Sequence, residues 1–451
     1  MGAILTYAFA AIGVGLTGIA LIWVLQQRRS PQSALAWILF ILTVPWVGVP
    51  AFFAFGVRKR GAMYAPAVFQ NRAAPPPLNP LDDQLRRLDC PAATTGNSIT
   101  AETRASEARA TLTALVDEAE HSLCILLYQL EPDAASEAFI EALRRAALRG
   151  VEVRLVLDQV GAFWRPRRAL RRLRDAGVEI RLFPVFSVFR GTARLNLRNH
   201  RKLVLADGKR LWTGGRNVGA SYLGPDDAPG TWHDLSFMVE GPVVARYAEM
   251  FEADWSKITE TPTRPVVFDD TPVGKAQLQL VPSGADMEHD ALHDAIVHAI
   301  HTATRRIWIS TPYLLPTDQI QHALTTAARL GRDVRIMLPQ RSNQRVTDFA
   351  AGSYVRDLDE AGARILRHAP PMLHAKAILL DDIAIVGSAN LDVRSMLINF
   401  ESGLVLSDSA SVAAIETWFE EEFGHCAEGV EPAGLLRRLA EATFRLGAPV
   451  L

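Results

Sequence analysis

Cysteine is scarce in this sequence. Its 451 residues include only Cys90, Cys124 and Cys426, which are odd in number and far apart. This count excludes a disulfide framework, and the spacing excludes a Cys-x-x-Cys metal site, so a reducing compartment is favoured. Net charge is also nearly absent, because the 48 Lys and Arg residues are balanced by 49 Asp and Glu residues. A formal charge of −1 argues against a strongly electrostatic partner only if the two signs are evenly spread.

Charge is almost missing from the first 57 residues, which contain only Arg28 and Arg29. Residues 3–25 form an uncharged apolar run, about 34 Å long as a helix. Residues 34–57 form a second run, interrupted by two prolines. We expect either a transmembrane hairpin of two spanning helices or one span followed by an interfacial or re-entrant segment. A cleavable signal peptide is a poor fit, because the first run is too long and lacks a charged start.

Basic residues follow the second run, so the positive-inside bias predicts that the C-terminal body lies on the cytoplasmic side. These residues are Arg58, Lys59, Arg60 and Arg72. A proline-rich stretch at 75–80 is typical of a stiff spacer. The composition beyond it, within a chain that is 49% apolar, is that of a globular protein.

The body is built twice. Residues 111–182 and 291–367 show the same order of amphipathic helices and short apolar strands, and the pairs Tyr128/Tyr313 and Gly177/Gly362 share one offset. This alternation indicates α/β units with a largely parallel core. We expect four regions: a transmembrane helical hairpin (1–60), a linker (61–100), a first half (101–265) and a second half with a C-terminal helix (266–451).

Each half carries the same polar motif, His-x-Lys-x4-Asp, followed by a glycine-rich turn that ends in Asn. Two of the six lysines in the chain belong to these two motifs, which argues against a chance occurrence of the pattern. His and Lys two apart on a strand project from one face and can converge on a phosphate. The second turn is one residue shorter, so the turn types must differ. The motif residues are His200, Lys202, Asp207, Gly215 and Asn217, then His374, Lys376, Asp381, Ser388 and Asn390.

The doubled motif resembles the signature of the phospholipase D superfamily. The stretches STPYLLP, GSANLDVRSMLINFE and the terminal LAEATFRLGAPVL are similar to its cardiolipin synthase branch. The resemblance implies two tandem phospholipase D-like α/β/α halves packed into one bilobal catalytic unit. It also implies a multi-pass phosphatidyltransferase of the bacterial inner membrane that condenses two phosphatidylglycerols to cardiolipin and glycerol.

Displacement at a phosphodiester needs a nucleophile, an acid for the leaving alkoxide and positive charge around the phosphoryl oxygens. We expect His200 to form a phosphatidyl-histidine and His374 to act as acid and then base, although the sequence does not decide which histidine attacks. The lysines and the two Asn amides would hold the oxygens. The resemblance places Asp207 and Asp381 among the catalytic motif residues with the histidines and lysines, although we expect them to hold the turn and a neighbouring cation rather than to move protons.

Each histidine also needs a carboxylate to fix its tautomer. Asp234 and Glu401 lie at comparable places after the two motifs and are the expected orienting pair; the alternative is that both are surface or capping groups. Which carboxylate serves which histidine is left open by the sequence.

A basic stretch leads into the first motif. Residues 165–202 carry a net charge of +10, and Phe183, Phe186 and Phe189 interleave with the basic residues. This pattern indicates a surface that meets anionic headgroups and inserts its aromatic side chains at the membrane interface, with residues 184–199 as a rim loop. The alternative is a solvated arginine-rich helix followed by a core strand.

We expect no cofactor and no metal, and assign His289, His293, His298 and His301 to an amphipathic helix. The expected partners are anionic phospholipid (phosphatidylglycerol) and the lipid bilayer, without nucleic acid; the oligomeric state is open. A water-using phospholipase D or a headgroup-exchange enzyme differs only in the acceptor. A nuclease shares the motif but is disfavoured by the apolar N-terminus, and a silent scaffold by the intact motifs.

Overall fold

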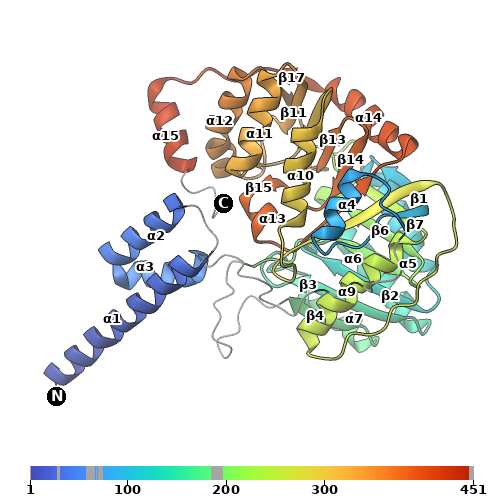
Figure 1. Ribbon diagram of the computed structural model, residues 1–451. Helices are drawn as coiled ribbons and strands as arrows, with labels where there is room; N and C mark the ends of the chain where they lie inside the picture. The colour runs from blue at the N-terminus through green and yellow to red at the C-terminus, as the bar shows by residue number, and fades with distance from the viewer. Residues whose placement is uncertain are drawn as a thin grey trace.

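The computed structural model describes residues 2–27, 31–56, 67, 69, 75–183 and 197–445. Its body is built on one 15-stranded sheet (Figure 1), ordered β17-β12-β11-β9-β13-β14-β16-β8-β1-β7-β6-β5-β2-β3-β4. The first-half strands are β1 (Thr94–Glu102), β2 (Ser122–Leu127), β3 (Glu152–Asp158), β4 (Glu179–Phe183), β5 (Leu203–Ala206), β6 (Arg210–Gly214) and β7 (Ser236–Glu240). The second-half strands are β8 (Ala276–Ser283), β9 (Arg306–Ser310), β11 (Asp333–Pro339), β12 (Arg364–His368), β13 (Ala377–Leu380), β14 (Ile383–Gly387), β16 (Glu401–Leu406) and β17 (Cys426–Glu428).

The sheet shows the predicted duplication directly. The order β1-β7-β6-β5-β2-β3-β4 is repeated as β8-β16-β14-β13-β9-β11-β12, and the two copies meet at the antiparallel β1–β8 pair. Parallel pairing is confined to β2–β3–β4 and β9–β11–β12. The largely parallel core expected from the sequence is therefore wrong for the centre of each half. The hairpins after the two motifs have turns of two or three residues, and such turns permit only antiparallel pairing.

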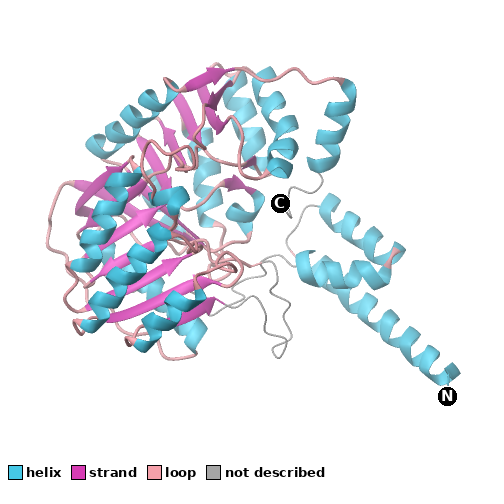
Figure 2. Cartoon of the chain, turned by 180° about the vertical axis from the view of Figure 1, so that it is seen from behind, coloured by secondary structure: helices cyan, strands magenta, loops and turns pink. Residues whose placement is uncertain are grey.

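Helices cover both faces of the sheet (Figure 2). One face carries α5 to α8 over the first half and α10 to α12 over the second, and α9 and α14 cover the opposite face. The core beneath α9 and α14 is shared by both halves, which therefore fold as one body. The helices are α4 (Pro80–Arg87), α5 (Ala105–Asp117), α6 (Ala134–Leu148), α7 (Arg167–Asp175), α8 (Ala220–Leu223), α9 (Val243–Thr259), α10 (Ala291–Thr302), α11 (Asp318–Arg329), α12 (Arg345–Glu360), α13 (Val393–Leu397), α14 (Ser409–Phe423) and α15 (Leu435–Arg445).

The N-terminal helices project from the body in both views (Figures 1 and 2). They are α1 (Gly2–Gln26), α2 (Pro31–Thr43) and α3 (Pro45–Ala51), followed by a short π-helical turn. Across the described ranges, no helix combines the length and the apolar character needed to cross a membrane. The second predicted span is not one helix, because the chain leaves the helical conformation at Val44, just before Pro45.

The boundary between linker and body also differs from the prediction. Residues 61–100, expected to be a linker, contain α4 and the start of β1. Asn79 caps α4 by accepting a hydrogen bond from the backbone N–H of Asp82, which anchors this segment locally. The basic residues that predicted the orientation (58–60 and 72) lie outside the described residues.

Candidate active site

The two motifs meet where the halves face each other. His200 and Lys202 immediately precede β5, and His374 and Lys376 immediately precede β13. The backbone N–H of His200 donates to the carbonyl of Phe400 at 2.8 Å. That of His374 donates to the carbonyl of His233 at 2.6 Å. Each histidine is thus fixed by the backbone of the opposite half.

The carboxylates that orient the histidines are also exchanged between the halves. Nδ1 of His200 lies 3.0 Å from both carboxylate oxygens of Glu401, which belongs to the second half. Nδ1 of His374 lies 2.6 Å from Oδ2 of Asp234, which belongs to the first half. All four side chains are buried. In both pairs the carboxylate favours a proton on Nδ1, so that Nε2 is the nitrogen suited to act as nucleophile or base.

Aromatic rings complete the walls around the histidines. The ring of Tyr128 packs edge-on against His200, with 4.7 Å between centroids. Tyr222 and Trp232 pack against His374 at 5.4 and 5.2 Å. These contacts restrict the rotation of both imidazoles and keep them in a water-poor environment.

The motif lysines are buried beside the histidines. Nζ of Lys202 donates to the carbonyl of His200 at 2.7 Å, and Nζ of Lys376 lies 2.6 and 3.0 Å from Nδ1 and Nε2 of His374. Burial lowers the pKa of Lys202 to about 7 and that of Lys376 to about 8. Burial and then the Lys376 ammonium lower the pKa of His374 to about 3, and burial also lowers the pKa of His200. The site thus concentrates positive charge that an anionic phosphodiester would offset.

The residues of the two glycine-rich turns support the orienting carboxylates. A Cβ on Gly215 would lie 2.2 Å from Oδ1 of Asp234, so only glycine fits there. In the second half, the Ser388 hydroxyl donates to Oε2 of Glu401 at 2.6 Å, so Ser388 holds the carboxylate. Asn217 and Asn390 line the cavity; Oδ1 of Asn217 accepts from the N–H of Gln129 at 3.2 Å. Oδ1 of Asn390 is buried and accepts no hydrogen bond within the described residues.

The structure does not bring Asp207 and Asp381 to the histidines, although both are part of the motif. They lie at the far ends of β5 and β13, both with positive φ (53° and 47°). The Asp207 carboxylate accepts from the backbone N–H groups of residues 120–122 at 2.7–3.0 Å, and that of Asp381 from residues 304–306 at 2.7–3.0 Å. Their place among the catalytic residues is therefore not supported. Each closes a hairpin and ties it to the start of the neighbouring strand.

The site opens into a cavity of about 370 Å³ that lies between the halves. Its lining includes both histidines, both Asn side chains, and Tyr128 with its repeat partner Tyr313. Two arginines missed at the sequence level, Arg198 and Arg394, also line it. Burial and the proximity of Arg198 lower the pKa of Arg394. For Arg198, the available signal in the sequence was its position two residues before His200. For the two tyrosines, it was the offset that they share with other repeated residues.

The basic stretch is only partly described. Phe183 is 1% exposed and packs against Phe400 in the shared core, so its predicted insertion into lipid is wrong. Phe186, Phe189 and most of the expected rim loop lie outside the described residues. Among the described residues near α7, Phe163 and Trp164 are exposed and pack edge to face just before the arginine-rich helix.

The histidine run lies in and next to α10, as expected for an amphipathic helix. His293 is buried, with Nε2 2.9 Å from the Thr317 hydroxyl and Nδ1 3.0 Å from Asp294. His298 and His301 lie on the same helix, and His289 precedes it. The buried member of the run is thus satisfied by hydrogen bonds within its own half.

Comparisons with known proteins match this arrangement. A family model described as cardiolipin synthase, PLD-like domain matches residues 112–255 and 296–423, and one described as phospholipase D-nuclease N-terminal matches residues 15–56. Cardiolipin synthase A of Pseudomonas putida is 29% identical over 96% of both chains. Cardiolipin synthase 1 of Bacillus anthracis is 30% identical over 99% of this chain and 94% of that protein. The phosphatidylserine synthase structure from Haemophilus influenzae Rd KW20 shares the fold, with a TM-score of 0.63 and 14% identity over 82% of this chain and 98% of its own.

Proposed function

The chain belongs to the phospholipase D superfamily, in its cardiolipin synthase branch, and on this premise we propose that it condenses two phosphatidylglycerols to cardiolipin and glycerol. The observation that carries the proposal is the exchanged pair of histidine–carboxylate contacts facing one cavity. Two histidines with fixed tautomers, together with buried cations, are the groups that a two-step phosphoryl transfer requires.

In the first step, Nε2 of His200 attacks the phosphorus of one phosphatidylglycerol. The P–O bond to glycerol breaks, and a proton on Nε2 of His374 passes to the departing oxygen. The Nζ of Lys376 lies 3.0 Å from this nitrogen, which makes protonated His374 a strong acid, as a leaving alkoxide needs. The positive charge of the phosphatidyl-histidine is balanced by Glu401.

In the second step, the hydroxyl of another phosphatidylglycerol gives its proton to His374, and its oxygen attacks the phosphorus. The P–N bond breaks and His200 returns to its starting form. Lys202, Lys376 and the amides of Asn217 and Asn390 hold the non-bridging oxygens throughout. Asp207 and Asp381 take no part in the proton transfers.

The transferase proposal is tested by reconstitution. Purified protein in vesicles receives phosphatidylglycerol alone and then with phosphatidylethanolamine, and products are read by mass spectrometry. Cardiolipin and glycerol in equal amounts are expected. Free phosphatidic acid as the dominant product would show that water is the acceptor and would overturn the transferase assignment.

The assignment of nucleophile and acid is tested with a substrate whose leaving group is p-nitrophenolate, which departs without protonation. His374→Ala should form a phosphatidyl adduct on His200 with this substrate, visible by intact-protein mass spectrometry, whereas His200→Ala should form none. An adduct in His200→Ala but not in His374→Ala would reverse the two roles.

We also propose that α1 to α3 hold the enzyme at the bilayer, with the body on the cytoplasmic side. Large apolar side chains on these helices are exposed, among them Val14 (74%), Leu25 (70%) and Leu39 (61%). Exposed apolar surface of this extent is stabilised by lipid. Deleting residues 2–56 should release the protein from cell membranes into the soluble fraction; continued sedimentation with membranes would contradict this anchor.

A further inference from the structure

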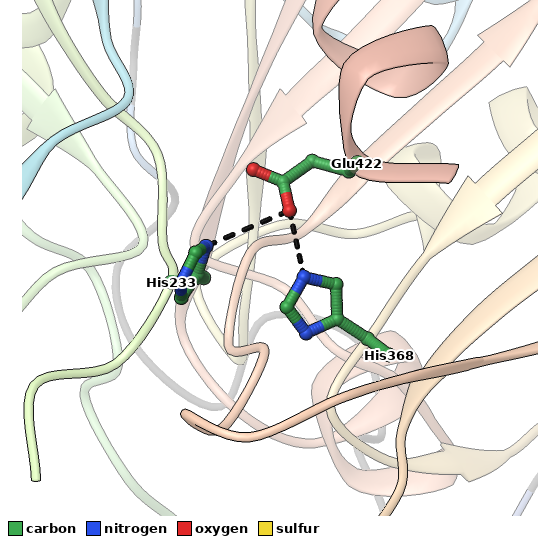
Figure 3. A group of neighbouring side chains, drawn as sticks. All are labelled: His233, His368 and Glu422. Carbon is green, nitrogen blue, oxygen red and sulfur yellow. Dashed lines mark hydrogen bonds and ion pairs between the residues drawn. The ribbon is translucent and has the colours of Figure 1, made fainter. Parts of the chain in front are cut away.

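A second cluster of ligand-type side chains lies away from the catalytic cavity. Figure 3 shows the carboxylate of Glu422 between the imidazoles of His233 and His368. Nε2 of His368 is 2.7 Å, and Nδ1 of His233 is 3.5 Å, from the same oxygen of Glu422. One possible ligand atom from each residue lies within 4.8 Å of the other two. None of the three residues lines the cavity around His200 and His374.

The three side chains come from separate parts of the chain and from both halves. His233 lies on the segment before β7, His368 ends β12, and Glu422 lies near the end of α14. Their side chains are 36%, 2% and 12% exposed, respectively. The site is thus held by two buried groups of the second half and is reachable from solvent on the side of His233.

We propose that His233, His368 and Glu422 bind a divalent transition-metal ion of the Zn²⁺ type. Two imidazoles and one carboxylate form a ligand set used by zinc sites with three protein ligands, and water completes the coordination. Imidazole nitrogens favour Zn²⁺ and its neighbours over Mg²⁺ and Ca²⁺, which prefer oxygen ligands. Both imidazoles already direct a nitrogen toward the shared carboxylate, so a small rearrangement converges all three on one ion.

The site is coupled to the catalytic histidine through the backbone. The N–H of His233 donates to the carbonyl of Met372 at 2.9 Å, and its own carbonyl accepts from the N–H of His374 at 2.6 Å. Its chain neighbour Asp234 orients His374. A bound metal clamps this first-half segment onto the second half, so its role is to position the Asp234–His374 pair and to stabilise the contact between the halves.

The binding test uses the full-length chain without a histidine tag, stripped with a chelator and titrated with Zn²⁺, Co²⁺ or Mg²⁺. One Zn²⁺ per chain is expected, with a Co²⁺ form whose visible absorption indicates histidine ligands, and with weaker Mg²⁺ binding. His233→Ala removes the most exposed ligand and should weaken Zn²⁺ affinity by at least about 10–100-fold. The matched control is His289→Ala, taken from the surface group Asp89, Glu288 and His289, and it should keep the wild-type affinity.

Thermal unfolding gives a second readout that does not depend on activity. Zn²⁺ should raise the unfolding midpoint of the wild type and of His289→Ala, but not that of His233→Ala. The proposal is overturned if the stripped protein binds no Zn²⁺, if Mg²⁺ binds equally well, or if His233→Ala retains the wild-type affinity.

Discussion

At the scale of single residues, burial lowers the pKa of both motif histidines below that of a free imidazole. Burial and Lys376 lower the pKa of His374 to about 3, so this imidazole carries no proton on Nε2 at neutral pH in the free enzyme. A phosphodiester brings a negative charge next to the buried lysines, which raises the pKa of the whole group. In the proposed mechanism, substrate binding therefore favours the protonated His374 that the first step consumes.

The buried lysines predict how activity depends on pH. Burial lowers the pKa of Lys202 to about 7 and of Lys376 to about 8, so raising the pH through this range removes the charge that attracts the phosphodiester. We expect kcat/KM, which reports on the free enzyme, to fall as pH rises through about 7–8. The matching fall in kcat should occur at higher pH, because bound phosphodiester stabilises both ammonium groups. A kcat/KM that is constant across this range would contradict the expectation.

The exchanged carboxylates give a second prediction at this scale. Glu401→Gln and Asp234→Asn each allow the wrong tautomer of the paired histidine and should lower kcat by about 10²–10⁴-fold, with little change in KM. In a His200→Ala background, Glu401→Gln should not lower kcat further, whereas Asp234→Asn should still lower any residual kcat. The control is Glu428→Gln, which removes an exposed carboxylate that pairs with Arg364. Equal losses from both carboxylate changes in that background would indicate that the pairs do not act separately.

At the scale of elements, the aspartates of the two motifs belong to hairpins rather than to chemistry. Each carboxylate accepts three backbone N–H bonds, so Asp207→Ala or Asp381→Ala leaves these donors without their partner. We expect each change to lower the free energy of unfolding by about 1–3 kcal/mol. The kcat of the folded fraction should change little. Denaturant unfolding and active-site titration separate the effect on stability from the effect on kcat. A 100-fold loss of kcat at unchanged stability would show that these residues have a catalytic role.

The hairpins also show how far a local pattern can be used. The one-residue difference between the turns predicted different turn types, and the structure has a three-residue turn at 207–209 and a two-residue turn at 381–382. Spacing alone could not show that Asp207 and Asp381 lie at the far ends of their strands from the histidines. The motif is contiguous in sequence, but a strand separates its two ends in space.

The apolar runs show the same limit. Their length and lack of charge were visible in the sequence, and so was Pro45, but hydropathy does not reveal that the second run divides into α2 and α3 at Val44. The order of helices and strands repeated over 111–182 and 291–367 could, by contrast, be predicted, whereas the antiparallel pairing at the centre of each half could not. Contacts between the copies, such as His200–Glu401, depend on how the halves pack together, and no repeating pattern in the sequence encodes them.

At the scale of the whole molecule, the two halves need each other for both core and chemistry. The segment between α9 and β8 is exposed and has no regular structure, so the chain can be divided there. We expect fragments 1–265 and 266–451 to be inactive alone and active when co-expressed, since each supplies the carboxylate for the other's histidine. Cardiolipin formation in cell membranes measures the result.

A matched pair of first-half variants controls this experiment. Asp234→Asn in fragment 1–265 should abolish the restored activity, whereas Asp227→Asn, at an exposed position, should not. Activity of either fragment alone would show that the exchanged contacts are dispensable.

The exchange of carboxylates between the halves has a consequence for the origin of the chain. A single ancestral half with this geometry would have been a symmetric dimer, in which each copy lent its acidic side chain across the two-fold axis. Fusion of two such copies would keep one shared centre on that axis and would allow the two copies to differ in sequence. The orienting carboxylate, Asp234 or Glu401, and the length of the motif turn are two features in which the halves differ in this way.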